Sequence, residues 1–239
     1  MPRIVVSNLT KCYGAVAAVE NVTFTLEPGT LTGFVGANGA GKSTTVRMLL
    51  GLTRPTAGTA TIDGKPYAAL TDPTRTVGAL TDPFVFLPGR SGRSALRVLA
   101  RASRIPDSRV DMMLELVDLL PYARRRVGSY SMGMRQRLGL AVALLGDPAV
   151  LILDEPANGL DPFGVHWLRG LLRTFADEGR TVLVSSHLLA ELEQVADHVI
   201  LIDHGRLVAQ GAAADLMAHH RAASLEELYL GIVTKGSPS

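Results

Sequence analysis

The stretch Gly36-Ala37-Asn38-Gly39-Ala40-Gly41-Lys42-Ser43 decides the fold of this chain, because it fits the pattern G-x-x-x-x-G-K-[ST]. It directly follows an apolar run at Leu31–Val35 and directly precedes a helical pattern that reaches Leu49. The three glycines allow positive φ, so several backbone N–H groups can point inward at one anion. Strand, glycine-rich loop and helix, in that order, predict a nucleotide phosphate site in an α/β protein.

The residue types in this loop have distinct chemical roles. The N-terminus of the helix contributes about half a positive charge. Lys42 adds a full charge, directed at the β- and γ-phosphates, and Ser43 offers a hydroxyl to Mg²⁺. The residues expected to contact the nucleotide here are Gly36, Ala37, Asn38, Gly39, Ala40, Gly41, Lys42, Ser43 and Thr44.

A second apolar run, Val150–Leu153, ends in the acidic pair Asp154-Glu155. Such a run is typical of a buried strand, and ligands of α/β sheets bind at the carboxyl ends of the strands. Asp154 is therefore the expected Mg²⁺ partner, through a bound water, because Mg²⁺ keeps several waters in proteins. Glu155 lies one residue further along and can reach an attacking water.

Composition limits the other function classes. The chain has 239 residues, 47% of them apolar, with 24 Lys plus Arg against 22 Asp plus Glu. A net charge of +2 is too small to favour nucleic acid as the main ligand, so no nucleic-acid partner is expected. No apolar stretch reaches the ~18 residues that a membrane span needs. The single cysteine excludes an intramolecular disulfide and a cysteine-cluster zinc site.

Short β-branched runs recur along the chain and predict its strands. The first five are expected to form hairpins because they lie close together, and the last three are expected in crossover units because they alternate with helical segments. Between residues 84 and 130 the pattern becomes helical. One helix is predicted from a Ser91 cap to about Ser103, and another over Asp107–Leu120. The predicted strands are Ile4–Ser7, Val22–Leu26, Leu31–Val35, Thr59–Ile62, Val77–Leu80, Val150–Leu153, Thr181–Ser185 and Val199–Asp203.

Three further segments follow in a distinctive order: Tyr130-Ser131-Met132-Gly133-Met134, then Gly159-Leu160-Asp161, then His187 after a strand. Together with the phosphate loop and the acidic pair, this set resembles the nucleotide-binding subunit of ATP-binding cassette (ABC) transporters. The resemblance covers residues 3–230. It implies a P-loop NTPase fold with a parallel RecA-like core, an antiparallel β subdomain and a helical subdomain inserted at 84–130. Residues 231–239 are expected to form a flexible tail.

The resemblance also implies roles for single residues. Tyr13 matches the aromatic residue that stacks on adenine, although an ordinary tyrosine at a strand end is the alternative. Ser131 and Gly133 match residues that grip the γ-phosphate bound by a second subunit. Asp161 matches the residue that links the two sites, and His187 matches the histidine that contacts the γ-phosphate and orients water. Lys42, Glu155 and His187 are thus the expected catalytic residues, with Ser43, Asp154 and Asp82 at the metal.

The sequence departs from the usual family pattern in three places. The signature segment reads Tyr-Ser-Met-Gly-Met instead of Leu-Ser-Gly-Gly-Gln, which resembles the branch that serves two-component drug and antibiotic exporters. Asp82 stands where a glutamine is expected, which changes the charge near Mg²⁺. Ala157 stands where Thr or Ser is usual.

The resemblance implies a Mg²⁺-dependent ATPase that energises a separate membrane permease. A second ABC subunit, identical or different, would complete each site, and the permease would hold the protein at the cytoplasmic face of the membrane. The alternatives are an ABC ATPase that acts on ribosomes or nucleic acid, and an assembly factor with little turnover. Arg93, Arg97 and Arg101 form a helical stripe that could meet acidic permease residues or anionic lipid, or could simply be solvated.

Overall fold

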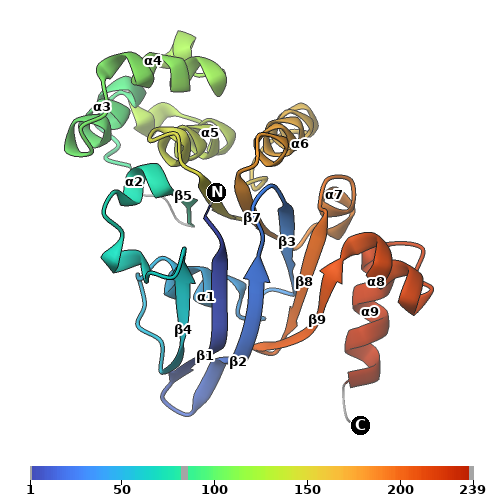
Figure 1. The fold of residues 1–239 in the computed structure, drawn as a ribbon. Coiled ribbons are helices and arrows are strands. Elements are labelled where there is room, and N and C mark those ends of the chain that lie inside the picture. Colours follow the sequence, from blue (N-terminus) through green and yellow to red (C-terminus); the bar gives the residue numbers. More distant parts are fainter. Residues whose placement is uncertain (1, 82–85, 237–239) are drawn as a thin grey trace.

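The computed structural model describes residues 2–81 and 86–236, and its strands form two sheets (Figure 1). The larger sheet has the strand order β5-β6-β7-β3-β8-β9. Its neighbouring strands run parallel except at the β8–β9 edge, which is antiparallel. Its strands are β3 (Leu31–Val35), β5 (Val77–Leu80), β6 (Val150–Asp154), β7 (Thr181–Ser186), β8 (His198–Asp203) and β9 (Arg206–Ala212).

The smaller sheet is antiparallel, with the order β2-β1-β4. It consists of β1 (Ile4–Tyr13), β2 (Val16–Leu26) and β4 (Ala57–Ile62). The hairpin prediction therefore holds for β1 and β2. It is wrong for the other three segments: β4 pairs antiparallel with β1 across a long stretch of chain, and Leu31–Val35 and Val77–Leu80 join the parallel sheet. The physical reason is burial, since every residue of β3 is buried, whereas β2 alternates toward its end between buried and exposed residues.

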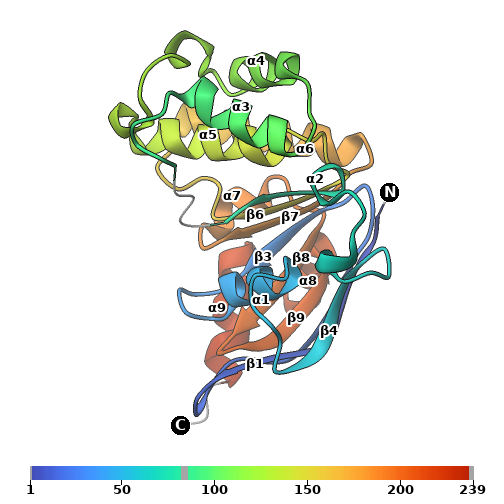
Figure 2. The same cartoon turned by 90° about the vertical axis from the view of Figure 1, so that its left-hand side faces the viewer.

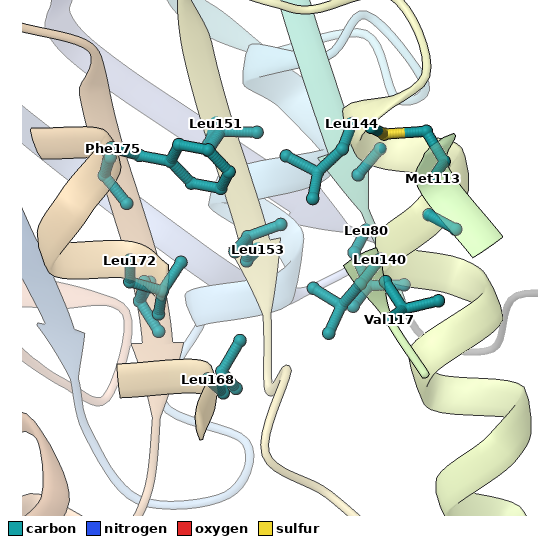
Figure 3. Packing of buried hydrophobic residues seen from close by; sticks show 14 of the residues in the cluster. Leu80, Met113, Val117, Leu140, Leu144, Leu151, Leu153, Leu168, Leu172 and Phe175 are labelled. Atoms are coloured by element: carbon teal, nitrogen blue, oxygen red, sulfur yellow. The ribbon is translucent and has the colours of Figure 1, made fainter. Parts of the chain in front are cut away.

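The two faces of the larger sheet belong to different hydrophobic clusters. Val150 and Ile152 of β6 pack with the small sheet and helix α1 (Lys42–Leu49), whereas Leu151 and Leu153 pack with the helices on the opposite face. This division follows from the two-residue period of a strand. Figure 3 shows the second cluster, in which side chains of α5 and α6 meet Leu151 and Leu153.

The remaining helices cover the second face and extend beyond it (Figures 1 and 2). The inserted helical part holds α3 and α4, which pack on α5. A short helix, α2, precedes β5, and α7 to α9 lie on the β8–β9 side of the molecule. Their bounds are α2 (Pro73–Thr76), α3 (Gly92–Ala102), α4 (Asp107–Leu116), α5 (Met132–Leu144), α6 (Pro162–Asp177), α7 (Leu189–Glu193), α8 (Ala213–His220) and α9 (Leu225–Gly236). In the described ranges, no helix is long and apolar enough to cross a membrane.

Two helix ends differ in their agreement with the sequence prediction. Ser91 caps α3 as expected, since its hydroxyl accepts a hydrogen bond from the Ser94 N–H. By contrast, α4 ends at Leu116 rather than Leu120, because Asp118 adopts a left-handed conformation with φ 57°.

The last helix extends into the segment that was predicted to be a flexible tail. α9 continues to Gly236, so residues 231–236 are helical, whereas residues 237–239 of the predicted tail lie outside the described residues. Ile232 packs against the core, and the Thr234 hydroxyl donates a hydrogen bond to the Leu230 carbonyl one turn earlier.

The arginine stripe of α3 is paired within the chain. Arg93 lies 3.1 Å from Asp111, and Arg97 and Arg101 lie 3.1 Å and 3.4 Å from Asp107. These acids belong to α4, or lie at its start, so the stripe joins α3 to α4. This pairing within the chain was not foreseen by either interpretation of the stripe, as a solvated face or as a contact with a permease or lipid.

Candidate functional site

The phosphate loop joins β3 to α1, and its glycines are required for two different reasons. Gly39 and Gly41 have φ of 84° and 107°, which favours glycine. Gly36 does not have a positive φ, so the prediction that this glycine is needed for its backbone conformation is wrong. A Cβ atom at Gly36 would instead lie 2.3 Å from the Ile202 carbonyl oxygen, because the loop passes close to β8.

Lys42 is held inside this loop. Its side chain is only 6% exposed, and Nζ donates to the carbonyl oxygens of Gly36 at 2.6 Å and Ala37 at 3.2 Å. Among the described residues, no side chain caps the N-terminus of α1. The first N–H groups of that helix therefore remain available for an anion, as a phosphate site requires.

The acidic pair lies where the sequence predicts, at the carboxyl end of β6. Asp154 is 2% exposed, and its carboxylate accepts a hydrogen bond from the Ser185 hydroxyl of the adjacent strand β7. The same hydroxyl accepts the Glu155 N–H at 3.0 Å. Ser185 therefore fixes both acidic residues, a role that nothing in the local sequence indicates.

Glu155 is held from several sides in an unusual conformation. Its φ is 50°, which costs a non-glycine residue about 1–3 kcal/mol and is common at functional sites. The Gln136 side chain donates to the Glu155 carbonyl at 3.1 Å. On the carboxylate, Oε1 lies 3.7 Å from Lys42 Nζ, and Oε2 lies 2.8 Å from His187 Nδ1.

These groups line one cavity of about 330 Å³. The cavity wall is formed by Ala18, Ala37, Asn38, Gly39, Gly41, Lys42, Ser43, Thr44, Asp154, Glu155, Asn158 and His187. Sequence reasoning missed Ala18 and Asn158. Asn158 follows the acidic pair by three residues and could have been found from that position, whereas Ala18 comes from β2 and carries no chemical signal.

A divalent cation fits the oxygen donors of this cavity. The Ser43 hydroxyl and the Asp154 carboxylate share its wall, and hydroxyl and carboxylate oxygens suit Mg²⁺. Over residues 2–81 and 86–236, no group of three or more His, Cys, Asp or Glu side chains could form a complete metal site. The donor set therefore suits an ion that takes its other ligands from phosphate and water. Asp82, also expected at the metal, lies outside the described residues.

The signature segment lies outside this cavity at the start of α5. The Ser131 hydroxyl caps α5 by accepting the Met134 N–H at 3.2 Å. Met132 is 65% exposed, and a Cβ atom at Gly133 would lie 2.8 Å from the Gly159 carbonyl oxygen. Tyr130 is buried and donates to the Tyr122 carbonyl at 2.9 Å; burial raises the pKa of this phenol above 10.0, so it stays a donor near neutral pH. The segment thus presents an exposed helix N-terminus to the surroundings.

Four more predicted residues are not part of the cavity wall, namely Gly36 and Ala40 of the loop, Tyr13 and Asp161. Tyr13 is 53% exposed at the end of β1, where Lys11 Nζ lies 5.0 Å from its ring centre. Asp161 caps α6, since its carboxylate accepts the Gly164 N–H at 2.7 Å. The structure therefore brings Lys42, Asp154 and His187 together with Glu155, and does not bring Tyr13 or Asp161 to them.

Comparison with known proteins gives a consistent picture. The family model of the ABC transporter matches residues 19–158. The bacitracin transport ATP-binding protein BcrA of Bacillus licheniformis is 41% identical over 207 residues, which cover 85% of this chain and 68% of the relative. The lantibiotic transport ATP-binding protein SrtF of Streptococcus pyogenes is 34% identical, with 86% and 89% covered. A solved structure described as the ATP-binding subunit of an ABC transporter has a TM-score of 0.87 at 29% identity, with 96% of this chain and 99% of the other covered.

Proposed function

Because the chain belongs to the ABC transporter family, we propose that it binds and hydrolyses ATP to energise a separate membrane permease. The relatives carry the names of bacitracin transport, lantibiotic transport and Nod factor export proteins. An exporter of drug-like or other small molecules is the proposed assembly. Such a permease would hold this subunit at the cytoplasmic face of the membrane.

One observation carries the enzymatic part of the proposal. Three adjacent strands, β6, β7 and β3, deliver Glu155, His187 and Lys42 to a single cavity at their carboxyl ends. The cavity combines the buried ammonium group of Lys42, the first N–H groups of α1, which no described side chain caps, and carboxylates. Phosphoryl transfer depends mostly on positioning and on charge stabilisation, and this arrangement supplies both.

The residues of the cavity divide the chemistry between them. Lys42 and the first N–H groups of α1 bind the phosphates and stabilise their negative charge. Ser43 and Asp154 would hold Mg²⁺, which neutralises charge on the phosphate oxygens when it is bound. Glu155 orients a water molecule for attack on the γ-phosphate and accepts a proton from that water. His187 holds the Glu155 carboxylate through their 2.8 Å contact.

A second subunit would complete each site. Ser131 is exposed at a helix N-terminus but lies outside the wall of this chain's own cavity. That geometry suits binding of Ser131 and Gly133 to a γ-phosphate held by another copy or by a related chain. Tyr13 is proposed to stack on adenine from the rim, and Asp161 is proposed to lie at the contact between subunits.

The Glu155→Gln variant tests the proposal. It keeps the size of the side chain and removes its charge, so Mg·ATP should still bind while kcat falls by about a hundredfold to ten-thousandfold. In Mg·ATP the variant should elute as a dimer from a sizing column. Glu115→Gln, an exposed glutamate on α4, is the matched control and should keep wild-type turnover. Full turnover in Glu155→Gln, or a monomer in Mg·ATP, contradicts the assigned role.

A further inference from the structure

The C-terminal helix α9 reaches the phosphate loop through a hydrogen bond between Tyr229 and Ala37. The Ala37 N–H donates to the Tyr229 hydroxyl oxygen at 3.0 Å, although the two residues are 192 positions apart. Ala37 belongs to the wall of the nucleotide cavity, and Tyr229 packs on the hydrophobic core. The tyrosine thus contacts the loop without lining the cavity itself.

The peptide that Tyr229 contacts also holds the catalytic lysine. Gly36 provides the carbonyl and Ala37 the N–H of one peptide unit, and the Gly36 carbonyl accepts from Lys42 Nζ at 2.6 Å. A peptide unit is planar, so the direction of its N–H fixes the direction of its carbonyl. The Tyr229 hydroxyl therefore orients the carbonyl that holds the Lys42 ammonium.

α9 is itself well anchored at its start. Leu225 and Leu228 are buried, and the Leu225 N–H donates to the Glu193 carboxylate of α7 at 2.8 Å. The Ser224 hydroxyl accepts the Glu227 N–H, and the Glu227 carboxylate accepts the Ala223 N–H, which is a reciprocal cap. α9 therefore contacts both the phosphate loop and α7, the helix that begins two residues after His187.

We propose that Tyr229 is a positioning residue that orients the Gly36–Ala37 peptide, and through it Lys42, for nucleotide phosphate binding. The inference rests on the proposed function, because it concerns nucleotide binding at the same cavity. Its mechanism is preorganisation: with the hydroxyl present, the carbonyl and the ammonium already have their paired geometry before nucleotide arrives. Without the Tyr229 hydroxyl, the Gly36–Ala37 peptide must adopt this orientation when the nucleotide binds, which weakens nucleotide binding.

The test compares Tyr229→Phe with wild type and with Tyr67→Phe. A neutral hydrogen bond contributes about a three- to tenfold factor to an equilibrium constant. Tyr229→Phe should therefore raise KM for ATP and the Kd for ADP by about three- to tenfold, with kcat within about twofold of wild type. Tyr67→Phe removes the hydroxyl of another half-buried tyrosine, which lies beside Gly51 at the end of α1, and should change neither constant.

A second measurement needs no nucleotide. Hydrogen exchange of the Ala37 amide should be faster in Tyr229→Phe than in wild type, again by about three- to tenfold, because the amide loses its acceptor. Unchanged KM and Kd in Tyr229→Phe, or a lower thermal midpoint without any change in these constants, overturns the inference. If wild type itself fails to bind ATP, the proposed function falls instead. In that case the exchange rate still decides whether Tyr229 holds the loop.

Discussion

Replacing Ser185 by Ala tests whether one buried hydroxyl holds both acidic residues of the site. In the structure this hydroxyl donates to the Asp154 carboxylate and accepts the Glu155 N–H, and Ser185 itself is fully buried. Removing it deprives a buried carboxylate of a donor. A hydrogen bond to a charged group contributes about 1.5–3 kcal/mol.

The loss of the hydrogen bond from the Glu155 N–H should cost less stability, because this N–H also donates to the Ser185 carbonyl oxygen at 3.1 Å. The total expected loss in the free energy of unfolding is therefore about 2–3 kcal/mol. For a chain of this length, each kcal/mol lowers the melting temperature by about 2–4 °C. Thermal unfolding followed by circular dichroism should show a decrease of about 4–12 °C.

The neighbouring Ser186→Ala variant provides the matched control. Ser186 is also a buried residue, and within the described part of the chain its hydroxyl accepts a single backbone hydrogen bond, from the Leu188 N–H at 2.9 Å. Ser186→Ala should therefore lower the free energy of unfolding by about 1 kcal/mol. If Ser185→Ala is no less stable than Ser186→Ala, the reasoning that the Ser185 hydroxyl fixes Asp154 is refuted.

Two further predictions concern the phosphate loop and the inserted helices. Gly36→Ala should destabilise the protein by about 1–3 kcal/mol and abolish ATP binding, because the added Cβ would lie 2.3 Å from the Ile202 carbonyl oxygen. Gly170→Ala on α6 is the control and should be neutral or stabilising, because beyond the backbone of α6 itself no atom of the described residues lies within 4 Å of the added Cβ. A nucleotide titration with equal affinity in both variants contradicts the steric argument. Arg97→Ala should lower the free energy of unfolding by less than about 1 kcal/mol, because both side chains of the Arg97–Asp107 ion pair are about two-fifths exposed to solvent. Urea denaturation measures this change. A much larger loss would contradict the expectation that this ion pair contributes little to stability.

The sequence predicted the parts of the site that local pattern controls. The phosphate loop, the buried strand before Asp154 and the helix capped by Ser91 each depend on neighbours within a few residues. β9 was not predicted, because the run Arg206–Ala212 mixes polar residues with apolar ones and has no buried face pattern. Lys42 was predicted from the loop motif and His187 through the family resemblance, but the contacts of both side chains with Glu155 were not predicted.

Contacts between distant parts of the chain could not be predicted. Nothing in the tail sequence indicates that Tyr229 meets Ala37, or that Ser185 meets Asp154, since both contacts depend on how the sheet is assembled. The misplaced hairpin assignment of Leu31–Val35 has the same cause. Proximity in sequence favoured a hairpin, but complete burial on both faces places this strand between β7 and β8.

The order of β6, β7 and β3 in the sheet determines where the chain should tolerate insertions. Neighbouring strands are about 4.8 Å apart, so main-chain hydrogen bonds set the separations between the strand ends from which Glu155, His187 and the phosphate loop with Lys42 extend. Lengthening the connections at the amino ends of these strands should leave those separations intact. Insertions in the connections at the amino ends of these strands can therefore accumulate without changing the arrangement of the groups that act on phosphate.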